Sequence, residues 1–280
     1  MATAQEITDR IVTETGAAPR DRTVDGIVFG DPATEVRGVA TVMMPTLDAL
    51  RGVVERGANL VVTHEPLFYD HLGDDAALAS EQDPVHAAKT AFLAQHGLVV
   101  WRFHDAWHDR RPDGILAGVL RALGVADDGG PAAARPAPET PAPAHPAETT
   151  LGQLAAHAAA ALGARAVRVV GDTAMPVALS RVAVQPGFVG FERNRHALAD
   201  ADVLIIGEGH EWEIGQYVTD AAALGLGKGM VVLGHAPSEA AGMDECARWL
   251  RTFLEEPVEF VAVPDPYRPV RATAAPSGAG

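Results

Sequence analysis

Apolar runs of strand length alternate with amphipathic stretches along the first half of the chain. Residues 59–62, NLVV, are apolar enough to lie inside a parallel sheet. Residues 45–57 predict a helix, because proline lies in the first turn and glycine at the end. Such alternation indicates βαβ units. We expect helices over 4–16, 45–57, 83–97 and 113–124, and strands over 36–44, 59–66 and 98–105.

The same rhythm resumes after a segment rich in proline and alanine. Residues 126–147 contain six prolines between Pro131 and Pro146, a composition typical of a semi-rigid linker or surface loop. Beyond it we expect helices over 150–163, 213–227 and 238–256, and strands over 166–172, 180–187, 201–209, 229–235 and 258–264.

The predicted fold class is therefore α/β, with two α/β halves whose mostly parallel or mixed sheets are flanked by helices. The predicted boundaries are a first half at 1–125, a linker or loop at 126–147, a second half at 148–270 and a disordered tail at 271–280.

Composition excludes several classes of protein. The chain of 280 residues has 22 Lys+Arg against 37 Asp+Glu and a net charge of −15, which argues against direct nucleic-acid binding. No apolar run approaches the roughly 20 residues of a membrane span, and no signal-peptide pattern opens the chain. We expect a cytoplasmic protein without a membrane partner. Cys246 is the one cysteine, so no internal disulfide is possible.

Three predicted strands end in histidine and acidic residues. The first carries His64 and Glu65 before a proline, and the second leads to His104 and His108. The third ends at His235, with Glu239 four residues later. A spacing of four places two side chains on one face wherever the backbone turns helically. Because ligands collect at the carboxyl ends of strands in open α/β sheets, we expect these groups to share a cleft there.

Imidazole and carboxylate are the usual ligands of zinc, manganese, iron and cobalt when thiolate is absent. One ion needs about three or four protein ligands, so six candidates favour two ions. A single histidine at a strand end is more often a hydrogen-bonded polar residue than a ligand. Three such strand ends in one chain make that explanation weaker.

Several segments resemble, in order, the motifs of the Ngg-interacting-factor-three family, whose members are also described as type 2 GTP cyclohydrolase I homologues. They are GANLVVTHEPLFY, VWRFHDAWH, GEGHEWEIGQYVTDAAALG and VLGHAPSEAAG, within residues 25–265. The resemblance implies an α/β fold with a dinuclear metal centre, assembled as a homo-oligomer, usually a ring-shaped hexamer.

Carried over by position, the resemblance assigns His64, His104, His235 and Glu239 as metal ligands. Glu65 stands where most members have a second histidine, and His108 stands where most have aspartate. Both replacements are competent ligands, so the expected metal set is His64, Glu65, His104, His108, His235 and Glu239, holding two divalent ions of Zn, Mn, Fe or Co. Asp105 is the alternative ligand if His108 points away.

The segment GEGHEWE resembles a further family motif that contains Glu208 and Glu211. Either carboxylate could orient a water molecule or act as a general base, and a solvated acidic loop is the alternative. Trp107 and Trp212 flank these motifs and could line a pocket or pack in the core. His71, without an evident partner in the sequence, is assigned no function.

Two functions remain open from the sequence. The first is a metal-dependent hydrolase acting on a small polar or nucleotide-like substrate. The second is a non-catalytic metal-binding protein that serves as a scaffold or adaptor.

Overall fold

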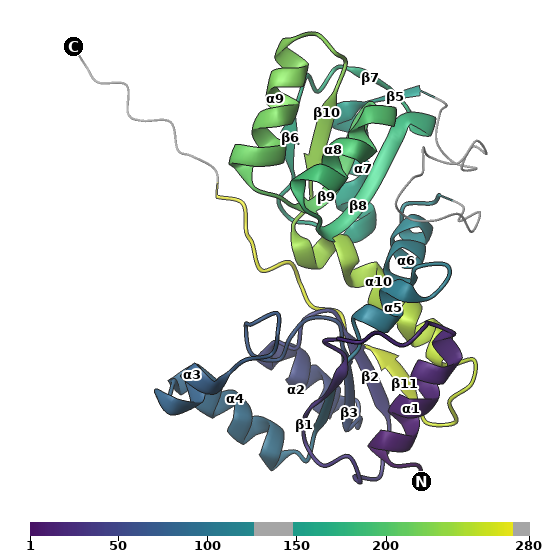
Figure 1. The fold of residues 1–280 in the computed structure, drawn as a ribbon, viewed down its shortest axis with the longest axis vertical. Helices are drawn as coiled ribbons and strands as arrows, with labels where there is room; N and C mark the ends of the chain where they lie inside the picture. The colour runs from purple at the N-terminus through teal and green to yellow at the C-terminus, as the bar shows by residue number, and fades with distance from the viewer. Residues whose placement is uncertain (126–147, 271–280) are drawn as a thin grey trace.

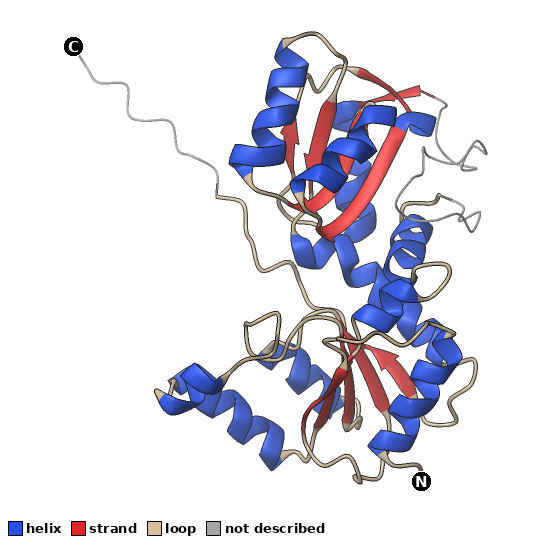
Figure 2. Ribbon diagram, viewed as in Figure 1, coloured by secondary structure: helices blue, strands red, loops and turns tan. Residues whose placement is uncertain are grey.

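The computed structural model describes residues 1–125 and 148–270. Two sheets lie one above the other, joined by helices at their junction (Figures 1 and 2). The predicted α/β class, with mostly parallel or mixed sheets flanked by helices, is confirmed. The predicted linker at 126–147 and tail at 271–280 lie outside the described residues. Among the described residues, no helix is both long and apolar enough to cross a membrane.

The first sheet has five strands in the order β1-β4-β3-β2-β11. Three of its four strand pairings are parallel, and the fourth joins β1 antiparallel to β4. The strands are β1 (Gly26–Phe29), β2 (Val39–Val42), β3 (Leu60–Thr63), β4 (Val99–Arg102) and β11 (Val258–Phe260).

Both faces of this sheet are covered, as the apolar strand sequences require. In β3, Leu60 and Val62 pack in a core with α1, while Val61 packs on the opposite face with α2 and α4. The helices of this part are α1 (Ala4–Thr15), α2 (Leu47–Glu55), α3 (Ala76–Ser80), α4 (Pro84–Gln95), α5 (Asp105–Asp109) and α6 (Gly114–Ala122).

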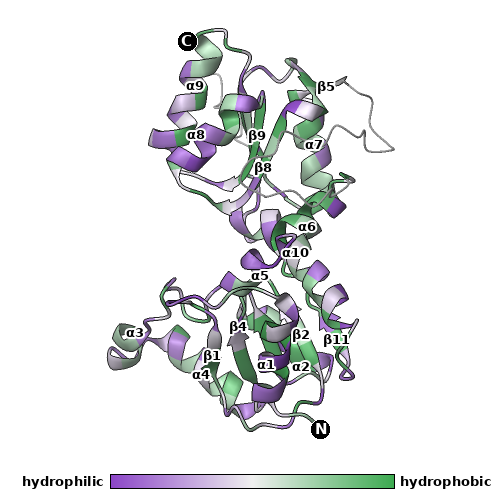
Figure 3. Cartoon of the chain, turned by 45° about the vertical axis from the view of Figure 1, so that its right-hand side comes forward, coloured by the Kyte–Doolittle hydropathy of each residue, from purple (hydrophilic) through white to green (hydrophobic). Residues whose placement is uncertain are grey.

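The second sheet has four strands in the order β6-β10-β9-β8, with β6 antiparallel and the other pairings parallel. One face packs against α7 and α10, and the other against α8 and α9. Hydrophobic residues concentrate on β8 and β9, whereas α8 and α9 carry hydrophilic segments (Figure 3). The bounds are β6 (Arg168–Val170), β8 (Val182–Phe188), β9 (Val203–Glu208), β10 (Gly229–Val232), α7 (Leu151–Leu162), α8 (Phe191–Asp200), α9 (Gln216–Ala223) and α10 (His235–Leu250).

Four short elements complete the second part. Strands β5 (Glu148–Thr150) and β7 (Pro176–Ala178) form an antiparallel pair, and η1 (Leu179–Arg181) leads into β8. A single π-helical turn, η2 (Glu211–Gly215), separates β9 from α9. Helix α8 was not predicted, because its sequence is strongly hydrophilic and only Asn194 and Leu198 are buried on it.

Helix α10 connects the two sheets. It begins directly after β10 of the second sheet, and the chain then enters β11, which pairs with β2 of the first sheet. The last predicted strand thus lies in the first sheet. The predicted limits of the two halves remain a prediction.

Helices α6 and α10 pack unusually close together, because glycines stand at their contact. A Cβ on Gly118 would lie 2.3 Å from the carbonyl oxygen of Ala241, and a Cβ on Gly242 would lie 2.5 Å from the Cα of Ile115. Trp107 Nε1 donates a hydrogen bond of 3.3 Å to the Gly242 carbonyl at the same place. Any larger side chain would push the helices apart.

We therefore expect Gly118→Ala to destabilise the protein, since its new methyl group meets backbone atoms that cannot rotate away. Overpacking of this kind costs about 1–3 kcal/mol of unfolding free energy. Urea unfolding followed by circular dichroism measures the change. Gly26→Ala is the control, because nothing lies within 4 Å of the added Cβ. Equal midpoints for the two variants would contradict the close contact.

Candidate metal centre

Helices α5 and α10 lie at the junction between the two sheets (Figure 1). The predicted ligand residues converge there from both parts of the fold. His64 and Glu65 directly follow β3, and His104 lies two residues after the end of β4. His235 is the first residue of α10, one residue beyond Gly234, whose φ of 95° turns the chain sharply from β10 into the helix. Each site residue is therefore placed by a strand end or by the helical turn after it.

Helical turns after two of the strands bring the paired residues onto one face. The amide of His108 donates to the carbonyl of His104 at 3.1 Å in α5, and Glu239 lies one turn after His235 in α10. In both α5 and α10, the spacing of four therefore places the two side chains on one face of a helical turn, as predicted.

Three histidines form the first group. The ring centroids of His64 and His104 are 4.5 Å apart and stacked. The ring of His108 lies 5.1 Å from that of His64 and 5.0 Å from that of His104. One nitrogen from each ring can be chosen so that all three lie within 4.8 Å of one another.

A second group shares His64 with the first. Ligand atoms of His64, Glu65 and Glu239 also lie within 4.8 Å of one another. His235 Nε2 is 2.9 Å from Glu65 Oε1 and 3.1 Å from Glu239 Oε2, and the contact with Glu65 has hydrogen-bond geometry. His64 Nε2 is 3.7 Å from Glu239 Oε2. The structure thus brings all six predicted metal-site residues together.

Three of the four imidazoles are held by a carboxylate at Nδ1. His104 Nδ1 is 3.0 Å from Asp105, His108 Nδ1 is 3.0 Å from Asp113, and His235 Nδ1 is 2.9 Å from Glu208. A carboxylate in this position accepts the Nδ1 proton, which in His104 and His108 leaves Nε2 with a free lone pair. This arrangement is the usual one for histidines that bind metal ions.

His64 has no such partner. Its side chain is completely buried, and neither ring nitrogen has a hydrogen bond to any residue that the structure describes. Glu239 is almost as buried, and its Oε2 is likewise without a hydrogen bond. Unpartnered buried polar atoms are costly in a folded protein, by about 1–3 kcal/mol each. A divalent cation would satisfy them, so the donor set fits a metal ion.

Burial and charge keep two of the histidines neutral. Burial lowers the pKa of His64 well below its usual value, and the neighbouring rings of His108 and His104 lower it further. Burial followed by the proximity of His108 also lowers the pKa of His104. Neutral imidazole is the form that binds metal.

His235 is in the opposite situation. Burial opposes its charged form, yet the nearby carboxylates of Glu239, Glu65 and Glu208 outweigh burial and raise its pKa to about 11. Burial also opposes the charged form of Glu65, but His235 and Arg102 together lower the pKa of that carboxyl. A proton on His235 offsets the negative charge of these carboxylates, and a bound cation between them would do the same.

Asp25 and Arg102 fix the backbone of the site, and sequence analysis missed both. Asp25 accepts hydrogen bonds from the amides of His104, Asp105 and Ala106 at 2.7–2.8 Å, which caps the short helix α5. The buried guanidinium of Arg102 donates to the carbonyl of His64 at 3.3 Å. Neither residue lies in a motif that would distinguish it in the sequence.

Two further residues, Asp105 and His71, lie beside His104. Asp105, the alternative ligand, accepts from His104 and Thr23 and pairs with Arg20. His71, assigned no function, has its ring 5.5 Å from that of His104.

Glu211 is not brought to the cluster. Its exposed carboxylate pairs with Arg168 at 2.8 Å. Trp107 is buried in the core, whereas Trp212 is exposed.

Fold and site together define a class: a two-sheet α/β protein with a partly buried cluster of histidines and carboxylates at the junction of the sheets. The family model Duf34/NIF3 (NGG1p interacting factor 3) matches residues 6–266. The chain therefore belongs to the Duf34/NIF3 family, as the sequence motifs predicted.

Solved structures share this fold. A Bacillus cereus protein related to NIF3 has a TM-score of 0.71 at 17% identity, covering 96% of this chain and 99% of that chain. Staphylococcus aureus protein SA1388 has a TM-score of 0.70 at 17% identity, with coverage of 96% and 99%. Protein ybgI, of unknown function, has a TM-score of 0.70 at 22% identity, with coverage of 95% and 100%. No curated protein matches the chain.

The carboxylates at Nδ1 generate a prediction. Asp113→Asn should weaken zinc binding about 10–100-fold, because the amide no longer accepts the His108 proton as a carboxylate does. Competition with a chromophoric chelator measures the affinity. Asp109→Asn is the control, because Asp109 lies in the adjoining helix and pairs with Arg20 rather than with a ring. Equal affinities in both variants would contradict the role of Asp113.

Proposed function

We propose that this protein binds two divalent metal ions and is a metal-dependent hydrolase acting on a small polar or nucleotide-like substrate. The observation that carries the proposal is His64. It is fully buried, has no hydrogen bond at either ring nitrogen, and belongs to both groups of converging ligand atoms. Such a residue is difficult to explain as a structural histidine.

The two groups would divide the ligands between two ions. His104 and His108 would serve one ion, and Glu65 and His235 the other, with His64 and Glu239 at the place where the groups meet. Zinc, manganese, iron and cobalt all accept this mixture of imidazole and carboxylate. A carboxylate between two cations reduces their mutual repulsion, and this is the role we assign to Glu239.

Two divalent cations in one site supply Lewis acidity, which makes a water more acidic and neutralises charge on a phosphoryl or carbonyl oxygen. The surrounding residues of the protein orient the ligand side chains. Asp105, Asp113 and Glu208 hold the ring protons of three histidines and so fix the direction of each Nε2. Glu208 is half exposed, so its second oxygen is available to accept a proton from a substrate or water.

Glu211 has no place in this proposal, because its carboxylate is exposed and paired with Arg168. The ring-shaped homohexamer that the family resemblance implies remains part of the proposal. A non-catalytic metal-binding scaffold is the competing function, and it differs in one measurable property: metal occupancy would bring no turnover.

Glu239→Gln tests the shared carboxylate. Glutamine keeps the shape but removes the charge and one acceptor oxygen. Loss of a buried charged contact costs about 2–5 kcal/mol, so the second ion should bind at least about tenfold more weakly. Metal analysis after dialysis should find one ion per chain where the parent holds two.

Glu245→Gln is the matched control, because Glu245 lies on the same helix and pairs with Arg121 at the surface. Two ions retained by Glu239→Gln at parental affinity would refute the shared carboxylate. A parent chain that never holds more than one ion would refute the dinuclear proposal itself.

A second experiment separates the hydrolase from the scaffold. Metal-free protein, prepared with a chelator, is reloaded stepwise with zinc, manganese, iron or cobalt. It is then assayed on p-nitrophenyl phosphate, bis-p-nitrophenyl phosphate and nucleoside phosphates. We expect turnover that rises with occupancy and is lost in Glu239→Gln but kept in Glu245→Gln. Full occupancy without turnover on any of these substrates would favour the scaffold.

A further inference from the structure

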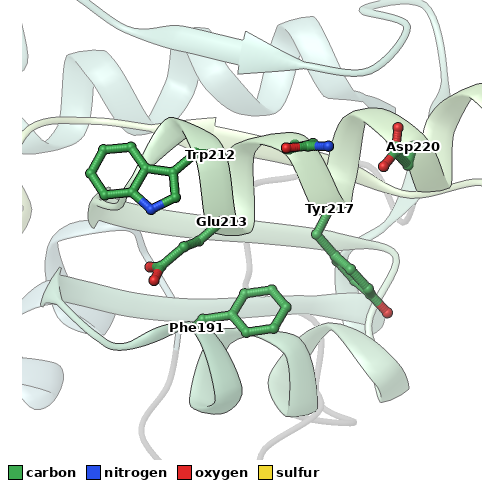
Figure 4. Close-up of a pocket in the computed structure, with 6 residues that line it drawn as sticks. Phe191, Trp212, Glu213, Tyr217 and Asp220 are labelled. Atoms are coloured by element: carbon green, nitrogen blue, oxygen red, sulfur yellow. The ribbon is translucent and has the colours of Figure 1, made fainter.

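A groove lined by aromatic and acidic side chains lies between α8 and the η2–α9 segment. Its volume is about 330 Å³, within the range of small-ligand sites. Figure 4 shows Glu213 and Tyr217 extending from η2 and α9 toward the helix that carries Phe191. The lining residues are Phe191, Trp212, Glu213, Gln216, Tyr217 and Asp220.

The aromatic rings of the groove are held in place yet left open to solvent. Trp212 stacks on His210 with centroids 4.2 Å apart and planes 11° apart, which covers one face of the indole. Trp212 is still 70% exposed and Tyr217 41% exposed. Phe191 and Tyr217 meet edge to face at 5.7 Å. Exposed aromatic surface gathered at one place is a mark of a binding site.

The charged groups that line the groove, Glu213 and Asp220, are both carboxylates and attract a positive charge. Glu213 accepts from His210 Nδ1 at 2.9 Å, which orients its carboxylate within the groove. The carboxylate of Asp220 forms no hydrogen bond or ion pair with any other residue that the structure describes. No lysine or arginine lines the groove, and nearby Arg195 is paired with Glu192 at 2.7 Å.

The backbone at this groove is also unusual. Residues Glu211–Gly215 form a π-helical turn, a rare conformation that occurs often at functional sites. Glu213, Gln216, Tyr217 and Asp220 follow at spacings of three, four and seven, which place them on one face of the segment. The turn therefore presents one acidic and aromatic face to Phe191 across the groove.

We infer that this groove binds a small organic cation that carries a quaternary ammonium group. Such cations lie over aromatic faces, where the electron-rich ring attracts them, and a nearby carboxylate completes the neutralisation. The two carboxylates repel anions, which excludes a phosphate group as the occupant of this groove. The inference requires no metal ion and stands apart from the proposed hydrolase activity.

The test uses choline and its neutral carbon isostere, 3,3-dimethylbutan-1-ol, at constant ionic strength. The two have the same shape, so a difference between them measures the charge. Isothermal titration calorimetry should show saturable choline binding that is at least about tenfold tighter than binding of the isostere. Quenching of Trp212 fluorescence should follow the same curve.

Variants locate the binding. Trp212→Ala should abolish saturable binding, and Glu213→Gln and Asp220→Asn should each weaken it several-fold. Tyr267→Ala and Asp48→Asn are the controls for loss of an exposed aromatic ring and of an exposed charge, and both should bind choline as the parent does. Circular dichroism confirms that each variant is folded.

Several results would overturn the inference. Equal affinities for choline and the isostere would show that the groove recognises apolar shape and not charge. A heat signal that rises linearly with choline concentration would show diffuse attraction to an acidic protein and no specific site. Loss of binding in Asp48→Asn would place the cation elsewhere. A change of oligomeric mass in Trp212→Ala, without choline binding by the parent, would make the groove a contact between copies of the chain.

Discussion

The close contact between α6 and α10 is the constraint on which the rest of the structure depends. Helix α10 begins at the end of β10 and leads to β11, so it connects the second sheet to the first. Gly118 and Gly242 allow it to approach α6 to a distance that no side chain would permit. Because α10 also carries His235 and Glu239, the same packing that joins the sheets sets the depth at which these residues meet His64.

A site divided between two sheets explains the burial of its ligands. Neither sheet alone could cover His64, since its neighbours Glu239 and His104 come from opposite sides of the junction. Gly187, near the end of β8, leaves room for the side chain of Glu239, because a Cβ on residue 187 would lie 2.3 Å from Glu239 Oε1. Its φ of 68° also favours glycine. The carboxylate of Glu239 thus occupies space that the second sheet leaves for it.

Sequence patterns were sufficient where a residue's position follows from its own strand. The apolar run of β3 ends at Thr63, so His64 had to lie at a strand tip, and the spacing of four after His104 and His235 described real helical turns. The pattern could not reveal which strands share a sheet, and β11 joins the first sheet from the far end of the chain. Asp25 and Asp113 act only through folded contacts, so no local signal marked them.

The return of β11 to the first sheet has a consequence for synthesis of the chain. Every other strand of that sheet is complete by Arg102, and the whole second sheet is made before Val258 emerges. Until then one edge of β2 is unpaired, because β3 is the only other strand that pairs with it in the described part of the chain. An open edge is a template on which a second chain can pair. A nascent or truncated chain that ends before Val258 therefore exposes the backbone of β2 to aggregation. Pairing of β11 with β2 removes this exposed edge.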